Sequence, residues 1–299
     1  MQKKTKQVFI DTLSLLDNLY VKQGLAVGEI EKIIVKPQWN VVIGSHGQSG
    51  MSLNFTGIHD LYSKDQWLLD ELKIYLGQNL FQVAQQLLNS SEITDLSIGF
   101  AALSALSRPF LSPDSLAERG IYILGDMESV RDLVLEEDCV TMVGYGGLLR
   151  PLLGRTKELH VTEMRPLELF QSIVIGEEIE YVPKVVQVHA AEENRKILSS
   201  SDVAILTASS FVNDTFDDLW DYSSSARLIG VYGPSVSFIP DVLFDSGIDF
   251  VFSFWASDPE SFVFDAVNDV DLEMALKINH CQRLMSRRSK TELKRKNRI

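Results

Sequence analysis

The feature that most constrains the fold is a series of short apolar runs in the second half of the chain, with helical patterns between them. The runs occupy residues 139–143, 159–162, 203–207, 228–232 and 250–252, and two of the helical patterns lie at 216–222 and 240–246. Apolar strands that alternate with helices predict a parallel sheet covered on both faces. The second half is therefore expected to form a doubly wound, Rossmann-like α/β domain.

The first half of the chain has a different order of predicted helices and strands. A helix is expected at 11–21, strands at 29–35, 39–43 and 51–55, and helices at 76–88 and 93–106. These elements predict a small α+β domain. Two prolines, Pro109 and Pro113, indicate an extended linker after it. The expected organisation is an α+β domain at 1–108, a Rossmann-like domain at 114–280 and a basic tail at 281–299.

The charge balance limits the partners of the chain. Asp and Glu number 41 against 28 Lys and Arg, so the net charge is −13, which disfavours binding to nucleic acid or to an anionic membrane. Basic residues gather between Arg283 and Arg298, and this segment is expected to be solvated or to dock on an acidic partner. Asp11 interrupts any signal-peptide core, which favours a cytoplasmic protein. The sequence leaves the oligomeric state open, and the protein could form a homo-oligomer.

Candidate ligand-binding residues follow the strands of the predicted parallel sheet. Because the carboxyl ends of parallel strands meet at one edge, these residues are expected to share a rim. They are Gly144, Tyr145, Gly146, Gly147, Glu163, Arg165, Asn213, Thr215, Gly233, Pro234 and Ser235. The segments at 213–215 and 233–235 are also typical of a helix N-cap and of a turn, respectively.

The glycine-rich loop that starts at Gly144 leaves two readings open. Glycines let a ligand approach backbone N–H groups at a helix start, and Glu163 lies 19 residues after Gly144, where a dinucleotide-binding fold places its ribose-binding acid. Leu149 stands where that pattern has its third glycine. The alternative is a tight turn, with Glu163 paired to Arg165.

Metal ligands are sparse in the sequence. The five histidines show no His-x-x-x-His spacing, and the two cysteines, Cys139 and Cys281, are far apart, with Cys139 at the strand end away from the rim. His46 stands out because glycines flank it in the loop at 44–50. His46 and Glu163 both follow strand ends in glycine-rich settings, so they are expected to line one cleft.

Seven stretches of the sequence resemble, in order and spacing, a family of uncharacterised prokaryotic proteins named after heavy-metal chelation. They are Ser97–Leu106, Val143–Tyr145, Thr162–Pro166, Ser201–Thr207, Val212–Thr215, Gly233–Ser235 and Pro240–Gly247. The resemblance implies an enolase-N-terminal-like domain followed by an atypical Rossmann-like domain, with a ligand cleft between them. It also implies a metal role, for which His46, Glu163 and Asp214 are the expected imidazole and carboxylate ligands. Ala208 departs from the family pattern, which often has glycine there.

The favoured function is binding of a small ligand, a metal ion or a metal complex, in the interdomain cleft. One alternative is a Rossmann-like transferase or oxidoreductase that uses a nucleotide cofactor such as NAD or S-adenosylmethionine, with Glu163 on the ribose. The other is a non-catalytic scaffold that docks through its basic tail. The sequence identifies no catalytic residue and no reaction.

Overall fold

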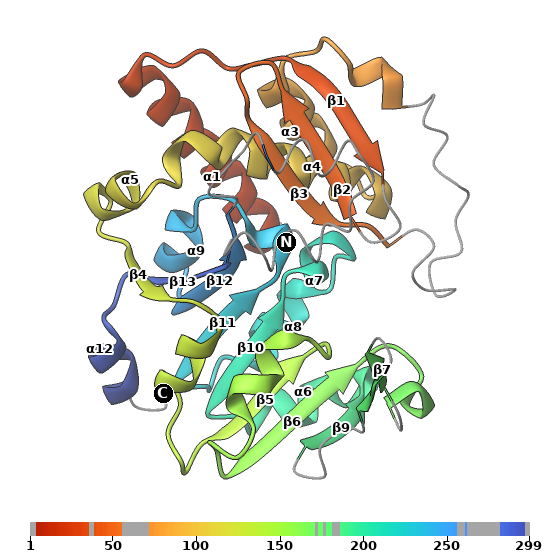
Figure 1. The fold of residues 1–299 in the computed structure, drawn as a ribbon, viewed down its shortest axis with the longest axis vertical. Helices are drawn as coiled ribbons and strands as arrows, with labels where there is room; N and C mark the ends of the chain where they lie inside the picture. Colours follow the sequence, from red (N-terminus) through yellow and green to blue (C-terminus); the bar gives the residue numbers. More distant parts are fainter. Residues whose placement is uncertain are drawn as a thin grey trace.

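The computed structural model of the chain describes residues 4–35, 39–55, 72–170, 173–175, 178–180, 186–255, 261 and 282–296. The described part of the chain forms a three-stranded sheet in the upper part of the molecule, an eight-stranded sheet below it and a two-stranded hairpin, with helices around them (Figure 1). His59, His280 and Cys281 lie outside the described residues. Within those residues, no helix combines the length and the apolar character that crossing a membrane requires.

The larger sheet has eight strands, and its centre is parallel as predicted. The strand order is β4-β13-β12-β11-β10-β5-β6-β9, and the strands from β12 to β9 all run in one direction. Along the chain, β5, β6 and β9 extend the sheet one way, and β10, β11 and β12 extend it the other way. The order therefore reverses between β5 and β10, which is where doubly wound sheets bind ligands. The strand bounds are β4 Tyr122–Gly125, β5 Cys139–Val143, β6 Glu158–Glu163, β9 Val186–Ala190, β10 Val203–Thr207, β11 Leu228–Tyr232, β12 Phe250–Phe254 and β13 Gln282–Ser286.

Short helices connect these strands and cover both faces of the sheet. The α-helices are α5 Pro113–Glu118, α6 Asn194–Ser199, α7 Ser209–Val212, α8 Phe216–Tyr222, α9 Asp241–Asp245 and α12 Lys290–Arg295. The 3₁₀ helices are η4 Met127–Asp132, η5 Gly147–Leu152, η6 Leu167–Phe170, η7 Ala191–Glu193 and η8 Pro234–Val236. A small hairpin of β7 Ile173–Ile175 and β8 Glu178–Glu180 lies between β6 and β9 in the sequence.

The first half forms the expected mixture of helices and an antiparallel sheet. Its elements are α1 Lys4–Gln23, β1 Ile30–Val35, β2 Trp39–Gly44, β3 Ser49–Leu53, η2 Lys73–Tyr75, α3 Leu80–Leu88 and α4 Ile93–Ser107. Helix α4 is apolar on most sides because it is buried almost all round, between the sheet and its neighbouring helices. Phe9 of α1 packs edge-on against Phe100 of α4, Phe211 of α7 and Phe238. These rings join the two halves of the chain in one apolar core.

The segment between the two halves is helical, not extended. A 3₁₀ helix, η3 Arg108–Phe110, follows α4 directly, and α5 begins at Pro113. Ser112 caps α5 by accepting a hydrogen bond from the backbone N–H of Ser115 at 3.3 Å. Proline fits the first turn of a helix, where its missing N–H needs no partner. Both prolines therefore start helices here, which corrects the expectation of an extended linker.

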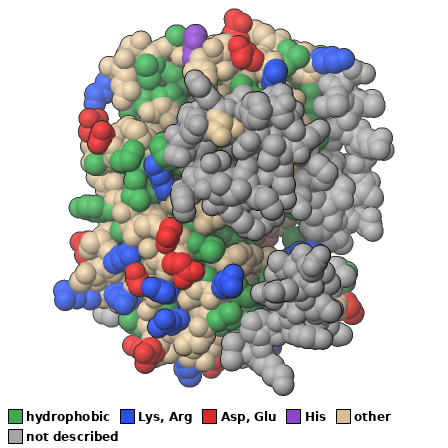
Figure 2. All heavy atoms as spheres, in the orientation of Figure 1, with side chains coloured by type: hydrophobic (Ala, Val, Ile, Leu, Met, Phe, Trp, Pro, Cys, Tyr) green, Lys and Arg blue, Asp and Glu red, His purple; other side chains and the backbone are tan. Residues whose placement is uncertain are grey.

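The basic C-terminal segment is part of the sheet and not a solvated tail. Strand β13 pairs with β12 and β4, and α12 follows it (Figure 1). Arg288 and Lys296 pair with the buried carboxylate of Asp249 at 2.6 and 2.8 Å, and Lys290 pairs with Asp132 at 2.7 Å. Figure 2 shows basic and acidic side chains interspersed over this lower left region. The acidic body of the molecule thus supplies partners for the basic segment.

Replacing Gly50 with alanine should lower the free energy of unfolding by about 1–3 kcal/mol, the usual range for overpacking. Gly50 lies in β3, and an added Cβ would overlap the backbone of Ala101 and Ala105 in α4. Urea denaturation measures the effect. Gly147→Ala is the control because its Cβ would meet only Met127 Sδ at 3.5 Å. Equal stability of the two variants would contradict this close packing of hairpin and helix.

Candidate functional site

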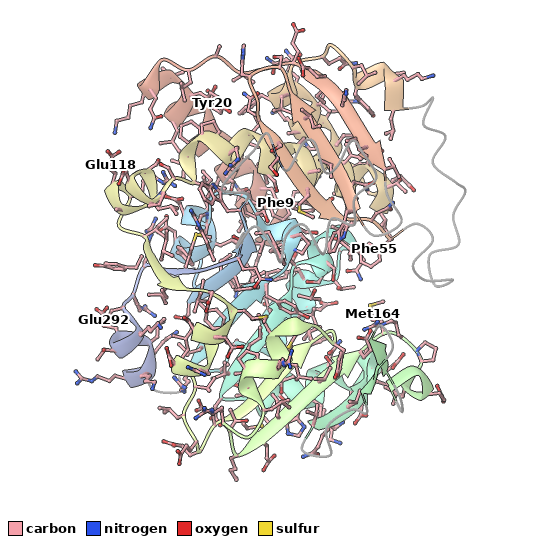
Figure 3. All side chains as sticks on the ribbon, viewed as in Figure 1. Phe9, Tyr20, Phe55, Glu118, Met164 and Glu292 are labelled. Atoms are coloured by element: carbon pink, nitrogen blue, oxygen red, sulfur yellow. The ribbon has the colours of Figure 1, made fainter. Side chains whose placement is uncertain are left out.

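A cavity of about 760 Å³ lies at the switch point of the large sheet. Its lower wall comes from the ends of β5, β6, β10 and β11, and its upper wall from Trp39, Leu53 and Phe55 around β2 and β3. Figure 3 shows Phe55 in the upper part and Met164, just beyond β6, below it. The cavity is therefore built from both halves of the chain.

Most of the predicted rim residues line this cavity. They are Gly144, Tyr145, Gly146, Glu163, Arg165, Asn213, Thr215, Gly233, Pro234 and Ser235. Gly147, which begins η5, is not among the lining residues. The structure thus brings the loops after four strands together, and ligand binding by them stays a prediction.

The glycine loop after β5 is held by a tyrosine. Gly144 has a φ of +82°, a conformation that favours glycine. The hydroxyl of Tyr232 donates to the carbonyl oxygens of Val143 at 3.1 Å and Gly144 at 2.8 Å. Burial raises the pKa of Tyr232 well above its ordinary value. The loop leads into a short 3₁₀ helix containing Pro151, so the predicted nucleotide-binding helix start is absent at this point of the described chain.

Glu163 is buried, and its carboxylate is fully engaged inside the protein. One oxygen accepts hydrogen bonds from the backbone N–H groups of Met164 at 2.9 Å and Arg165 at 3.0 Å. The other accepts from the backbone N–H of Tyr145 at 2.9 Å and from the Arg165 guanidinium at 2.8 Å. A carboxylate has about four acceptor positions, and these donors fill them. Glu163 therefore fastens the loop at Tyr145 to the end of β6.

The same contacts set the charge of Glu163. Burial by itself would raise the pKa of this carboxyl, but the hydrogen bonds from Arg165 and the Tyr145 backbone outweigh it and hold the pKa below the ordinary value of 4.5. Glu163 is thus an anion paired with Arg165, the alternative that its sequence context left open. A ribose hydroxyl would have to displace one of these donors.

The predicted metal set does not come together. His46 lies in the turn between β2 and β3, whereas Trp39 and Leu53, at the other end of the same hairpin, line the cavity. The turn and the open end of a hairpin lie at opposite ends of its strands, so the prediction that His46 and Glu163 share the cleft is wrong. Asp214 is exposed, has a φ of +60° and is not among the lining residues.

The structure adds wall residues that the sequence argument missed. The aromatic ones are Trp39, Phe55, Tyr222 and Tyr232, and the polar ones include Thr162, Asn194 and Arg195. Among the described residues, Thr162 Oγ1 and Asn194 Oδ1 are buried without a hydrogen-bond partner. Thr162 directly precedes Glu163, so its position at the end of the predicted strand could have identified it as a rim residue. Asn194 follows β9, a strand that the sequence did not predict.

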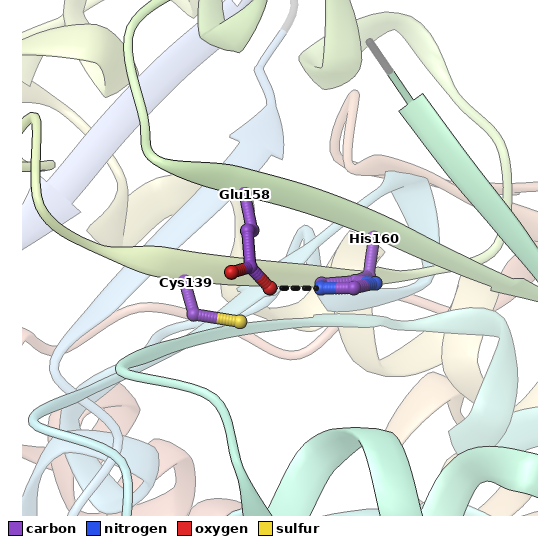
Figure 4. A group of neighbouring side chains, drawn as sticks. All are labelled: Cys139, Glu158 and His160. Carbon is purple, nitrogen blue, oxygen red and sulfur yellow. Dashed lines mark hydrogen bonds and ion pairs between the residues drawn. The ribbon is translucent and has the colours of Figure 1, made fainter. Parts of the chain in front are cut away.

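A second group of side chains with potential metal-ligand atoms lies at the other end of β5 and β6. Cys139, Glu158 and His160 have ligand atoms within 4.8 Å of one another, and a dashed line in Figure 4 marks the 3.2 Å contact between Glu158 Oε2 and His160 Nε2. His160 Nδ1 lies 3.0 Å from His189 Nε2. Burial and then the neighbouring His160 lower the pKa of His189, although Glu193 opposes them. The spacing of His160 and Glu163 places them on opposite faces of the strand, whereas Glu158, two residues before His160, lies on the same face and was not predicted.

Comparisons with known proteins agree with this architecture. Two family models, DUF4213 at residues 20–107 and DUF364 at residues 126–269, match the chain, and both are described as "Putative heavy-metal chelation". An uncharacterised protein from Methanocaldococcus jannaschii is 20% identical over 222 residues, which are 73% of this chain and 74% of that protein.

Crystal structures of two DUF364 proteins of unknown function show the same fold. The one from Desulfitobacterium hafniense has a TM-score of 0.63 and 20% identity, over 92% of this chain and 97% of its own. The one from Pyrococcus horikoshii has a TM-score of 0.62 and 18% identity, over 92% and 98%. With both models matched in chain order, this protein belongs to the family described as putative heavy-metal chelation proteins.

Proposed function

We propose that the protein binds a flat, partly apolar organic molecule with a polar edge, free or as its metal complex, in the cavity between the two halves. The volume of about 760 Å³ falls within the roughly 300–1,000 Å³ of small-molecule sites. Trp39, Phe55 and Tyr222 offer aromatic surface for a flat body, and hydroxyl and amide groups lie among them. Such a mixture of aromatic wall and few polar groups is typical of ligand pockets.

The observation that carries this proposal is a pair of buried polar atoms in the cavity wall. Thr162 is 1% exposed, and neither its Oγ1 nor Asn194 Oδ1 has a partner within the described part of the chain. Leaving such an atom unsatisfied costs about 1–3 kcal/mol. Both atoms are shielded from solvent in the ligand-free protein, so a ligand reaches them through a side-chain rotation. Asn194 Oδ1 is an acceptor, so it then matches an N–H or O–H donor on the edge of the ligand.

The lining residues favour an organic ligand over a bare heavy-metal ion. Soft ions prefer thiolates, and borderline ions are bound by imidazole as well, but the described lining contains neither cysteine nor histidine. The other candidate ligands in the lining, the Met164 thioether and the carboxylates of Glu192 and Asp218, are a weaker set for such an ion. Glu163 is already saturated by its four donors. A metal would therefore enter this cavity within its own organic chelator.

Replacing Thr162 with valine should weaken binding roughly 2- to 10-fold, the value of one hydrogen bond, without lowering stability. Within the part of the chain that the structure describes, the Thr162 hydroxyl has no hydrogen bond to lose. The probe is anilinonaphthalene sulfonate, an aromatic anion with a flat naphthalene ring and an N–H donor, titrated by fluorescence. Calorimetry with NAD and S-adenosylmethionine tests the nucleotide alternative, for which no binding is expected.

Thr141→Val is the matched control because Thr141 is also buried on this sheet, but its hydroxyl lies 2.5 Å from Ser201 Oγ and outside the cavity. It should lose stability and keep the probe affinity. Asn213→Trp, which fills the cavity, should reduce affinity at least about 10-fold, whereas Asn18→Trp on an exposed face of α1 should not. Full affinity of Asn213→Trp would overturn the proposal.

A further inference from the structure

We propose that Cys139, Glu158 and His160 form a binding site for a divalent ion of the zinc class, separate from the cavity. The site lies at the end of β5 and β6 that is opposite the rim (Figure 4). It is an inference independent of the proposed function, because no residue of this group lines the cavity.

The sheet register brings the three side chains onto one face. Cys139 pairs with Glu158, and Thr141 pairs with His160, in the parallel ladder of β5 and β6. Glu158 and His160 are two residues apart, so their side chains point the same way. The backbone under the site is anchored as well, since the N–H of Cys139 donates to Asp202 Oδ2 at 2.9 Å. The ligand atoms are therefore held by regular secondary structure and not by a loop.

The distances between the ligand atoms suit a tetrahedrally coordinated ion. Two nitrogen or oxygen ligands about 2.1 Å from a tetrahedral zinc ion are about 3.4 Å apart. Glu158 Oε2 and His160 Nε2 are 3.2 Å apart, close to that edge. The Cys139 sulfur lies within 4.8 Å of both, so a small side-chain rotation completes a triangle around one ion.

A second histidine supports the orientation of the first. With an ion on His160 Nε2, the proton of the neutral ring is on Nδ1, which lies 3.0 Å from His189 Nε2. His189 then accepts through Nε2, and its Nδ1 faces Glu193 Oε1 at 3.7 Å. Ligating histidines usually donate their other N–H to such a partner. Glu158, His160, His189 and Glu193 thus form one ordered series.

The donor set selects the class of ion. One thiolate, one imidazole and one carboxylate suit Zn²⁺ or Co²⁺, whereas Mg²⁺ and Ca²⁺ prefer oxygen alone. Three protein ligands leave one of four positions for water or another molecule. The Glu158 side chain is 43% exposed, which gives the ion a path from solvent. Lys157 Nζ lies 3.7 Å from the other Glu158 oxygen and is itself largely exposed, so it can turn away.

The test uses the full chain after chelator treatment. Calorimetry with Zn²⁺ should give one ion per chain, and Co²⁺ should give visible d–d bands with a near-ultraviolet thiolate charge-transfer band. Cys139→Ser should abolish that band, and each of Cys139→Ser and Glu158→Gln should weaken zinc binding by more than about 100-fold. His189→Gln should weaken it about 10- to 100-fold, as outer-shell partners do.

Two matched controls remove the same residue types elsewhere. Cys281→Ser and His46→Gln should keep both the zinc affinity and the cobalt spectrum. Circular dichroism checks that each variant is folded, and the partly exposed Glu158 provides a second test if Cys139→Ser is unstable. Unchanged zinc affinity in Glu158→Gln, or a thiolate band that persists in folded Cys139→Ser, would overturn the proposal.

Discussion

Replacing Arg227 with leucine should lower the free energy of unfolding by about 3–5 kcal/mol, the usual cost of breaking a buried ion pair from one side. Arg227 and Asp138 are 5% and 3% exposed in their side chains, and the Nε and Nη2 edge of the guanidinium donates to both carboxylate oxygens. Arg227 also donates to the carbonyl oxygens of Leu133 and Leu293, each at 3.1 Å. The variant would leave a buried carboxylate without its counter-ion and two carbonyl groups without their donor.

Urea denaturation at neutral pH measures this loss. Arg131→Leu is the matched control, because Arg131 pairs with Glu128 at 3.7 Å on the surface, with 46% of its side chain exposed. Exposed pairs contribute about 0–1 kcal/mol, so the control should stay near the original stability. Replacing Asp138 with leucine as well should recover part of the loss, since no charge is then buried alone. Similar stabilities of Arg227→Leu and Arg131→Leu would show that the buried pair contributes little.

The centre of the large sheet could be predicted because its strands are apolar on both faces. Val203–Thr207 and Leu228–Tyr232 are such runs, and they are β10 and β11 of the structure. The outer strands carry no such signal. Strand β9 contains Gln187 and His189, and β13 lies within a block of basic residues whose partners, such as Asp249, are distant in sequence. The block of like charges therefore predicted a solvated tail. In the structure, ion pairs to residues distant in sequence stabilise a strand and a helix there.

The rim of the cavity could be predicted for a topological reason, but its chemistry could not. Parallel strands end at one edge, so Gly144, Glu163 and Ser235 were correctly expected near one another. Hydrogen-bond partners are a property of the folded backbone. Glu163 was expected to reach a ligand because nothing in the sequence indicates three N–H donors around it. For the same reason, the sequence did not single out Thr162, although its hydroxyl is one of two buried polar wall atoms without a hydrogen-bond partner among the described residues.

Replacing Glu163 with glutamine should lower the free energy of unfolding at neutral pH by about 3 kcal/mol, because hydrogen bonds to a charged group contribute about 1.5–3 kcal/mol each and the amide can keep only some of them. The Arg165 guanidinium would lose its counter-ion, and an amide NH₂ would face N–H donors. Glu128→Gln, at an exposed carboxylate, is the control and should change stability by no more than about 0.5 kcal/mol.

The pH dependence distinguishes this role from ligand contact alone. The folded pKa of Glu163 lies below its ordinary value of 4.5, so its charge stabilises the native state above that value. This contribution is lost as the pH falls through the folded pKa, because the native carboxylate is then protonated. The difference in urea midpoint between the original protein and Glu163→Gln should therefore be full at pH 7 and shrink steadily in acid. A carboxylate that only touched a ligand would give no such difference in the ligand-free protein, and equal midpoints at pH 7 would return Glu163 to the role of a ligand-binding acid.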